Sequence, residues 1–297
     1  MHIDTVVIVG MGVVGSALYN LAMRSRYRVY GIDIDPRKSV NRIDEVPRGS
    51  GVALHVAYPY SPQFIDSLCH YAEVLRPEMI VIHSTVKPGT SIEIYKRVKR
   101  VVAYSPVRGY HRCMDKHISW WSKWVAVLPP QAVDEVVEHL KELGFQRIRT
   151  CSDPTSLELA KLWETVLRAI LIASWQELHR IARMLGADIS VVMEFVGEVH
   201  RVLGDRPIMY PGIIGGHCLI PNTEILNSVR RSKLFEFVLE SNAKRVSELK
   251  DPDTAKEVEK AKEIAERFML KDYFECKDID LGYMKSRTLI RDSGNHV

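Results

Sequence analysis

Thr5-Val6-Val7-Ile8-Val9-Gly10-Met11-Gly12-Val13-Val14-Gly15 is the stretch that decides the fold. Its β-branched first half predicts a strand buried on both faces of a parallel sheet. In the glycine half, Gly10 makes a tight turn, Gly12 lets the backbone approach a pyrophosphate, and Gly15 permits close packing of a helix on the strand. That helix, expected to end near Arg26, presents unpaired N–H groups to phosphates. The stretch therefore predicts a dinucleotide-binding βαβ unit.

Asp33 follows the second predicted strand, Arg28 to Ile32, about twenty residues beyond the glycines. A carboxylate there binds the hydroxyls of an adenosine ribose. Because it would repel a 2′-phosphate, the expected cofactor is NAD rather than NADP, a preference that Arg37 and Lys38 moderate. The cofactor-binding candidates are the turn residues, Asp33 and the residues that end the next strands: Gly10, Met11, Gly12, Val13, Val14, Gly15, Asp33, Tyr58, Pro59, Ser84 and Thr85.

Further strands are expected at 52–58, 79–83, 101–104, 125–128 and 146–150, with helices at 63–75 and 131–143 between them. Asp153-Pro154 is a helix start, and the apolar residues that follow keep a helical period to Leu185. The predicted fold class is α/β: an N-terminal Rossmann domain with a doubly wound, mostly parallel sheet, then an all-α dimerisation-type domain and a helical tail. The expected domains are residues 1–152, 153–245 and 246–297.

Composition is that of an ordinary globular protein, with 46% hydrophobic and 26% charged residues. The absence of a long apolar run and of a signal-peptide pattern predicts no membrane span and a cytoplasmic location. A net charge of +4, spread along the chain, makes nucleic acid an unexpected partner. The five cysteines are scattered and odd in number, so we expect free thiols, without a disulfide or a metal site. They are Cys69, Cys113, Cys151, Cys218 and Cys276.

The second glycine cluster, within Pro211 to Asn222, precedes a single cysteine, Cys218. Such a loop suits a pocket floor beside a nucleophile, but it equally suits a tight turn with an inert buried thiol. On the long helix, Lys161, Thr165 and Arg168 share one face, where a lysine is usually solvated. These residues alone leave both interpretations open.

Together these motifs resemble those of the UDP-glucose/GDP-mannose dehydrogenase family, the nucleotide-sugar dehydrogenases. The resemblance covers about residues 3–245 and includes Ser84-Thr85-Val86-Lys87-Pro88-Gly89-Thr90, Ser105-Pro106, Lys161 and Gly215-Gly216-His217-Cys218. It implies a homodimer that oxidises the primary alcohol of a small-molecule substrate, a sugar or nucleotide sugar, to an acid in two hydride transfers to NAD.

Residue roles follow from the same resemblance. Cys218 would capture the aldehyde and hold it as a thioester, Lys161 would stabilise an oxyanion, and Thr85 would position a water or substrate oxygen. Thr165 and Asn222 occupy two further catalytic positions. The implied substrate-binding residues are Arg108, Gly215, Gly216 and His217.

This sequence departs from the family pattern at three catalytic positions and at the C-terminus. Val107 replaces a glutamate, Thr165 an asparagine and Asn222 an aspartate, and residues 246–297 stand where the family has a nucleotide-binding domain. Three functions therefore remain: a divergent dehydrogenase of this family, a two-electron dehydrogenase like the β-hydroxyacid and 6-phosphogluconate group, in which Cys218 is idle, and a non-catalytic NAD(H)-binding protein.

Overall fold

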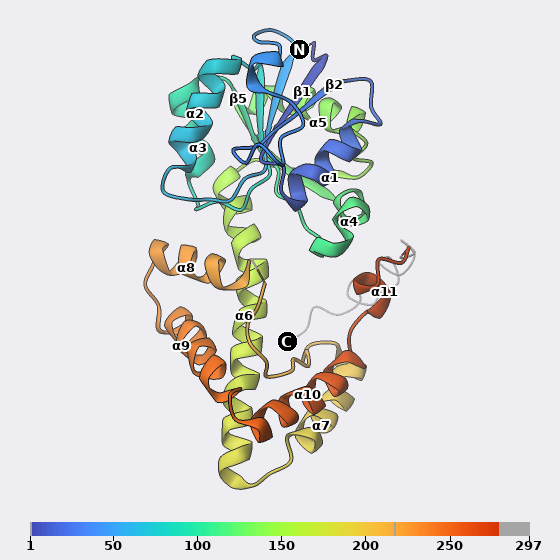
Figure 1. Cartoon of the computed structure of the whole chain (residues 1–297), viewed down its shortest axis with the longest axis vertical. Coiled ribbons are helices and arrows are strands. Elements are labelled where there is room, and N and C mark those ends of the chain that lie inside the picture. The colour runs from blue at the N-terminus through green and yellow to red at the C-terminus, as the bar shows by residue number, and fades with distance from the viewer. Residues whose placement is uncertain (1, 217, 279–297) are drawn as a thin grey trace.

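The computed structural model describes residues 2–216 and 218–278, which form a sheet domain and a helical part joined by one long helix (Figure 1). The sheet has seven strands in the order β2-β1-β3-β4-β5-β6-β7. All neighbouring strands run parallel except β5 and β6. The predicted α/β class with a mostly parallel sheet is confirmed. The strands are β1 (Thr5–Val9), β2 (Arg28–Ile32), β3 (Val52–Val56), β4 (Met79–Ile82), β5 (Val101–Tyr104), β6 (Lys123–Leu128) and β7 (Ile148–Cys151).

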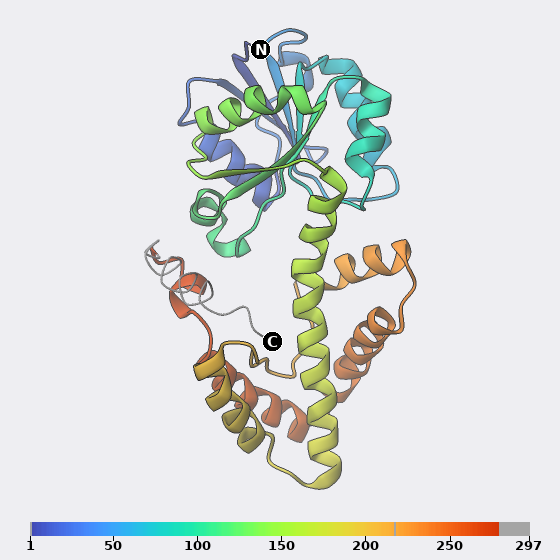
Figure 2. The ribbon, with the colours of Figure 1, turned by 180° about the vertical axis from the view of Figure 1, so that it is seen from behind.

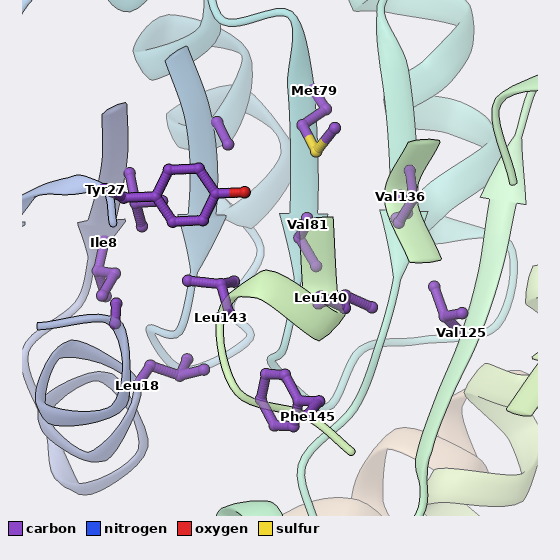
Figure 3. Close-up of a cluster of buried hydrophobic side chains, with 14 of the residues drawn as sticks. Ile8, Leu18, Tyr27, Met79, Val81, Val125, Val136, Leu140, Leu143 and Phe145 are labelled. Carbon is purple, nitrogen blue, oxygen red and sulfur yellow. The ribbon is translucent and has the colours of Figure 1, made fainter. Parts of the chain in front are cut away.

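Helices cover both faces of this sheet, and each face has its own apolar core. On one face lie α1 (Val13–Ala22), α4 (Met114–Trp120) and α5 (Val133–Glu142), packed on the cluster that Figure 3 shows. On the other lie α2 (Phe64–Leu75) and α3 (Thr90–Val98). Because both faces are covered, the central strands β1, β3 and β4 are buried along their whole length and are mostly apolar, with His55 in β3 as a buried polar exception. Single 3-10 turns occur at Ile43–Glu45, His111–Cys113 and Pro130–Ala132.

Helix α6 (Pro154–Leu185) is the axis of the helical part, as Figure 2 shows from behind. The Asp153 side chain caps it, accepting hydrogen bonds from the amides of Thr155 at 3.0 Å and Ser156 at 2.9 Å. Gly186 ends it in a left-handed conformation, with φ of 66°. The predicted long helix is thus confirmed, with the cap that its sequence indicated.

The remaining helices pack around α6. Helices α8 (Leu219–Val229) and α9 (Lys233–Glu248) contact it along one side, and α7 (Ile189–Leu203) pairs with α10 (Pro252–Glu266) near its far end (Figure 2). A short helix, α11 (Lys271–Phe274), follows. Helix α9 continues past residue 245, where we placed a domain boundary; the domain limits themselves stay predictions.

The expectation that all cysteines are free is wrong. Cys113, beside α4, forms a disulfide with Cys276, just after α11, and their Cα atoms are 5.2 Å apart. The two lie 163 residues apart in sequence, so only the docking of α11 beside α4 reveals the pair. Cys69, Cys151 and Cys218 are free.

One buried carboxylate, that of Glu158 on α6, attaches the helical part to the sheet domain. It accepts hydrogen bonds from the Gly89 amide at 2.6 Å, the Ser91 amide at 2.8 Å and the Ser91 hydroxyl at 2.6 Å. Those amides belong to the N-terminal end of α3, which has no intrahelical acceptors for them and whose dipole favours a negative charge. The orientation of α6 on the sheet domain therefore depends on Glu158.

We predict that Glu158→Ala destabilises the protein by about 2–4 kcal/mol, because it leaves three buried donors without an acceptor. Glu158→Gln keeps the volume and one acceptor oxygen and should cost less. Chemical denaturation measures both, with Glu164→Gln on the exposed side of the same helix as the control. Equal stability of wild type and Glu158→Ala would contradict the anchoring role.

Candidate active site

In the glycine turn between β1 and α1, close backbone contacts require glycine at two positions, Gly10 and Gly15, but not at Gly12. A Cβ on Gly10, where φ is +94°, would lie 2.6 Å from the Tyr58 nitrogen, and one on Gly15 would lie 1.8 Å from the Gly10 carbonyl oxygen. A Cβ on Gly12 would meet nothing within 4 Å. The space beside Gly12 is open, which is what close approach of a pyrophosphate requires.

Asp33 is held directly against this turn. Its carboxylate accepts hydrogen bonds from the Met11 amide at 2.6 Å and the Asp35 amide at 2.8 Å. A carboxylate offers about four acceptor positions, so it retains capacity for two hydroxyl groups. Together with the exposed Val13 at the start of α1, this geometry fits the adenosine and pyrophosphate parts of NAD.

The strand-end residues expected to bind the cofactor lie at the same edge of the sheet, but two of them also hold the loops. The Ser84 hydroxyl donates to the Tyr58 carbonyl at 2.6 Å, and the Tyr58 hydroxyl donates to the Phe64 carbonyl at 3.3 Å. Thr85 is half-buried and Pro59 is exposed. Thr85 and Pro59 are therefore freer to contact a ligand than Ser84 and Tyr58.

Cys218 lies at the start of α8 and is electrostatically linked to Lys161 on α6. Burial raises the pKa of the Cys218 thiol, the Lys161 ammonium lowers it, and the Glu164 carboxylate raises it. The Lys161 side chain is only 12% exposed, and its ammonium pairs with Glu164 at 3.2 Å. The structure thus brings the predicted nucleophile and cation together, but a carboxylate that we did not predict partly cancels the charge of Lys161.

Thr165 and Asn222, the two substituted catalytic positions, contact each other. The Asn222 amide nitrogen donates to the Thr165 hydroxyl at 2.8 Å, and that hydroxyl donates to the Leu162 carbonyl at 2.9 Å. Asn222 is buried, with 4% of its surface exposed. An uncharged, hydrogen-bonded pair occupies the positions where the resemblance implied an amide and a carboxylate.

The glycine-rich loop before Cys218 is fixed at its base. Gln176 on α6 donates to the Gly212 carbonyl at 2.7 Å, and the Asn242 side chain on α9 accepts from the Ile214 amide at 2.7 Å. Beyond these anchors Gly215 and Gly216 are exposed, and Gly216 has a φ of +85°. They are open to a ligand, as a substrate-binding role needs; His217 lies outside the described residues.

Arg108, the remaining substrate-binding candidate, makes its contacts within the sheet domain. It donates to the Ser122 carbonyl at 2.8 Å and lies over the Trp121 ring, 4.7 Å from the centroid. Burial lowers the pKa of the Arg108 guanidinium, and the Glu164 carboxylate of α6 raises it. Arg108 therefore lies on the side of the sheet domain that faces the helical part. Tyr273 of α11 accepts a hydrogen bond from the Trp121 indole at 3.2 Å, a contact that sequence reasoning missed.

The most specific match to known proteins lies in the helical part of this chain. Residues 155–248 match the central domain of the UDP-glucose/GDP-mannose dehydrogenase family. A UDP-N-acetyl-D-mannosamine dehydrogenase from Methanocaldococcus jannaschii is 26% identical over 189 residues, which are 62% of this chain and 43% of that protein. One from Pyrococcus horikoshii is 26% identical over 60% of this chain and 43% of its own length. The matches span less than half of these relatives.

Solved structures share the fold across most of the chain. The UDP-D-ManNAc dehydrogenase of P. horikoshii has a TM-score of 0.70 at 18% identity, over 81% of this chain and 68% of its own. The 3-hydroxyisobutyrate dehydrogenase of Mycobacterium tuberculosis has a TM-score of 0.58 at 12% identity, over 84% and 94%. At these identities the likeness concerns the fold alone. The matched central domain and the curated relatives support the resemblance of this chain to the UDP-glucose/GDP-mannose dehydrogenase family, of which it would be a divergent member.

Proposed function

We propose that this protein is an NAD-dependent oxidoreductase that acts on a CH–OH group of a sugar-like small molecule, with Cys218 and Lys161 at its reaction centre. The observation that carries the proposal is the open space at Gly12, beside an Asp33 carboxylate held on the same turn. The dehydrogenase names of the curated relatives support the reaction class.

In this proposal the bound NAD accepts hydride, and the protein supplies orientation and charge. The glycine turn and Asp33 hold the dinucleotide, with Thr85 and Pro59 beside it at the edge of the sheet. The Lys161 ammonium stabilises the oxygen of the substrate as its proton leaves, which a fixed cation does effectively in a water-poor site. Arg108, Gly215, Gly216 and His217 contact the rest of the substrate.

Cys218 divides the reaction into two halves. As a thiolate it would add to the aldehyde formed by the first hydride transfer and carry the carbon through the second. Burial, however, raises the pKa of this thiol, so at neutral pH it is protonated until a further positive charge approaches. The Thr165–Asn222 pair offers no carboxylate to activate a hydrolytic water. These two observations favour a second candidate, in which oxidation stops at two electrons.

A homodimer and a cytoplasmic location complete the proposal. Three exposed apolar side chains on α6, spaced four residues apart, form a stripe on one helix face: Leu159, Trp163 and Leu167. Such a face suits self-association. No helix within the described part of the chain is long and apolar enough to cross a membrane.

The first prediction concerns the cofactor. Gly12→Val should leave the fold intact, because the new side chain meets open space, and should abolish NAD binding, because it fills the room for the pyrophosphate. Isothermal calorimetry measures the affinity and thermal unfolding checks the fold, with Gly12→Ala expected to be intermediate. Undiminished affinity of a folded Gly12→Val protein would remove the cofactor assignment. NAD binding without NADH formation across nucleotide sugars and hydroxy acids would favour a non-catalytic protein.

The second prediction concerns the thiol. Glu164→Gln removes the carboxylate that raises the Cys218 pKa and releases Lys161, so that pKa falls and the thiolate fraction at pH 7 rises. Iodoacetamide should then alkylate Cys218 several-fold faster, because the thiolate is the reacting species. Peptide mass spectrometry separates Cys218 from Cys69 and Cys151. Glu177→Gln, on the same helix and paired with Arg180, is the matched control; equal rates in all three proteins would contradict the assigned electrostatics.

The third prediction concerns assembly. Light scattering should give the mass of a dimer, and Leu159→Lys combined with Trp163→Lys should give a monomer, because charges replace the apolar stripe. Val202→Lys and Leu203→Lys, exposed apolar residues at the end of α7, serve as the control pair. A monomeric wild-type protein would refute the dimer.

A further inference from the structure

A continuous chain of buried polar side chains crosses the sheet domain away from the glycine turn. It joins β6, the end of β4, the middle of β3, α5 and the start of β2. Its members, in order, are Lys123, His83, His55, His139, Tyr27 and Glu142. The first five are at most 7% exposed, whereas the side chain of Glu142 is 32% exposed and pairs with Arg26 at 2.9 Å.

Every link of this chain is a direct hydrogen-bond contact. The Lys123 ammonium nitrogen lies 3.0 Å from His83 Nδ1, His83 Nε2 lies 2.9 Å from His55 Nδ1, and His55 Nε2 lies 2.9 Å from His139 Nε2. His139 Nδ1 lies 3.0 Å from the Tyr27 hydroxyl, which donates to the Glu142 carboxylate. Both nitrogens of all three rings are therefore used within the chain.

The inner end of the chain lies at the edge of the sheet that also carries the candidate active site. Lys123 begins β6 at the sheet edge where β4 and β5 end, and it also donates to the carbonyls of Ser105 at 2.6 Å and Pro106 at 3.2 Å. The two charges that act on it are those of Arg108 and Lys161. The outer end lies at the surface, where Tyr27 packs in the apolar cluster below α5 (Figure 3).

The outer end sets the direction of the hydrogens. The Glu142 carboxylate can only accept, so the Tyr27 hydroxyl donates to it and must itself accept from His139 Nδ1–H. His139 Nε2 then accepts from His55 Nε2–H, and His55 Nδ1 accepts from His83 Nε2–H. His83 Nδ1 is left as an acceptor, and it faces the amino group of Lys123. The Ser105 carbonyl, which lies 2.8 Å from His83 Nδ1, accepts from Lys123 at 2.6 Å in this arrangement.

The same contacts remain satisfied after one proton has moved along the chain. Once Lys123 has taken up a proton from the site, one of its N–H bonds breaks and the lysine returns to a neutral amine. Each ring and the phenol gains one proton and gives up another, and an O–H bond forms at Glu142, which releases the proton to water. His83 Nδ1–H then donates to the Ser105 carbonyl, 2.8 Å away. Each passage reverses the hydrogen bonds, so the chain delivers one proton at a time, and the resting tautomers return when the ring nitrogens exchange protons with water.

The charge and burial of these groups favour proton transfer between them. Burial lowers the pKa of Lys123 well below its usual range, and Arg108 and Lys161 lower it further, so this amine gives up a proton more readily than an exposed lysine. Burial also lowers the pKa of His55 and His83 and takes that of His139 to about 4, so the rings rest neutral. Arg26 holds the pKa of Glu142 below its usual value, so a proton arriving there passes to water.

We propose that Lys123, His83, His55, His139, Tyr27 and Glu142 form a proton-transfer chain between the candidate active site and solvent. In the proposed function, on which this role rests, each hydride transfer from an alcohol to NAD releases one proton, and the chain carries it from Lys123 to the surface. Lys123 is its inner acceptor, and the three histidines and Tyr27 are positioning residues that act through it.

The test uses Tyr27→Phe, which keeps the packed ring and removes the outer link. In the wild-type protein labelled with ¹⁵N-histidine, proton–nitrogen NMR correlations at pH 7 should place the hydrogens on Nε2 of His83 and His55 and on Nδ1 of His139. In Tyr27→Phe, His139 Nδ1–H would have no acceptor, so all three rings should switch together, to Nδ1–H, Nδ1–H and Nε2–H. His179, bonded to Arg245 and Glu257, is the internal reference, and Tyr30→Phe is the matched variant.

A switch confined to His139, or opposed directions in the wild-type rings, would overturn the proposal, because a static polar cluster needs no coupling across two ring contacts. In turnover assays, Tyr27→Phe should lower the rate of NAD reduction by about tenfold or more with unchanged NAD affinity. Unchanged turnover would overturn the role in proton release. If wild type reduces no NAD, the proposed oxidoreductase fails, and the tautomers alone decide whether the chain exists.

Discussion

The docking of α6 through Glu158 is the interaction on which the arrangement of the site depends. Three hydrogen bonds from the start of α3 hold this carboxylate, and Lys161 follows it by three residues on the same helix. Because a helix is stiff over one turn, the anchor fixes where Lys161 stands relative to the sheet edge. Cys218 reaches the same place from α8, which packs on α6. The glycine turn and the Lys161–Cys218 pair are thus related through one buried group.

The charges around Cys218 differ from those that the resemblance to the family implies. Lys161 favours the thiolate, whereas burial and Glu164 oppose it, and burial is the largest of the three effects. Thr165 and Asn222, at two positions that depart from the family pattern, hydrogen-bond to each other. The protein therefore keeps the nucleophile and the cation in an environment with less negative charge and less basicity than the resemblance implied.

The fold was predictable from sequence because its signals are local. The run from Thr5 to Gly15, the cap at Asp153 and the apolar period of α6 each depend on neighbouring residues, and the structure contains all of them. The pairing of Lys161 with Glu164 was also within reach, since three residues separate them on a helix. Its importance was missed because such pairs are common on solvated faces.

The sequence could not show contacts between segments that are far apart along the chain. The histidines at 55, 83 and 139 are scattered among apolar residues, and only the parallel order β3-β4 with α5 above it brings their rings together. The same is true of Glu158 with Gly89 and Ser91. A lone histidine or glutamate in an apolar run carries no marker of its partner, because that partner is chosen by topology.

The Cys113–Cys276 bond has a consequence for how the chain behaves when cut. It closes a covalent ring that contains β6, β7 and every helix from α4 to α11. A single proteolytic nick anywhere in that ring leaves both pieces attached to each other, and the ends of the helical part cannot diffuse away from the sheet. Loss of this part therefore requires two events, a cut in the backbone and reduction of one sulfur–sulfur bond.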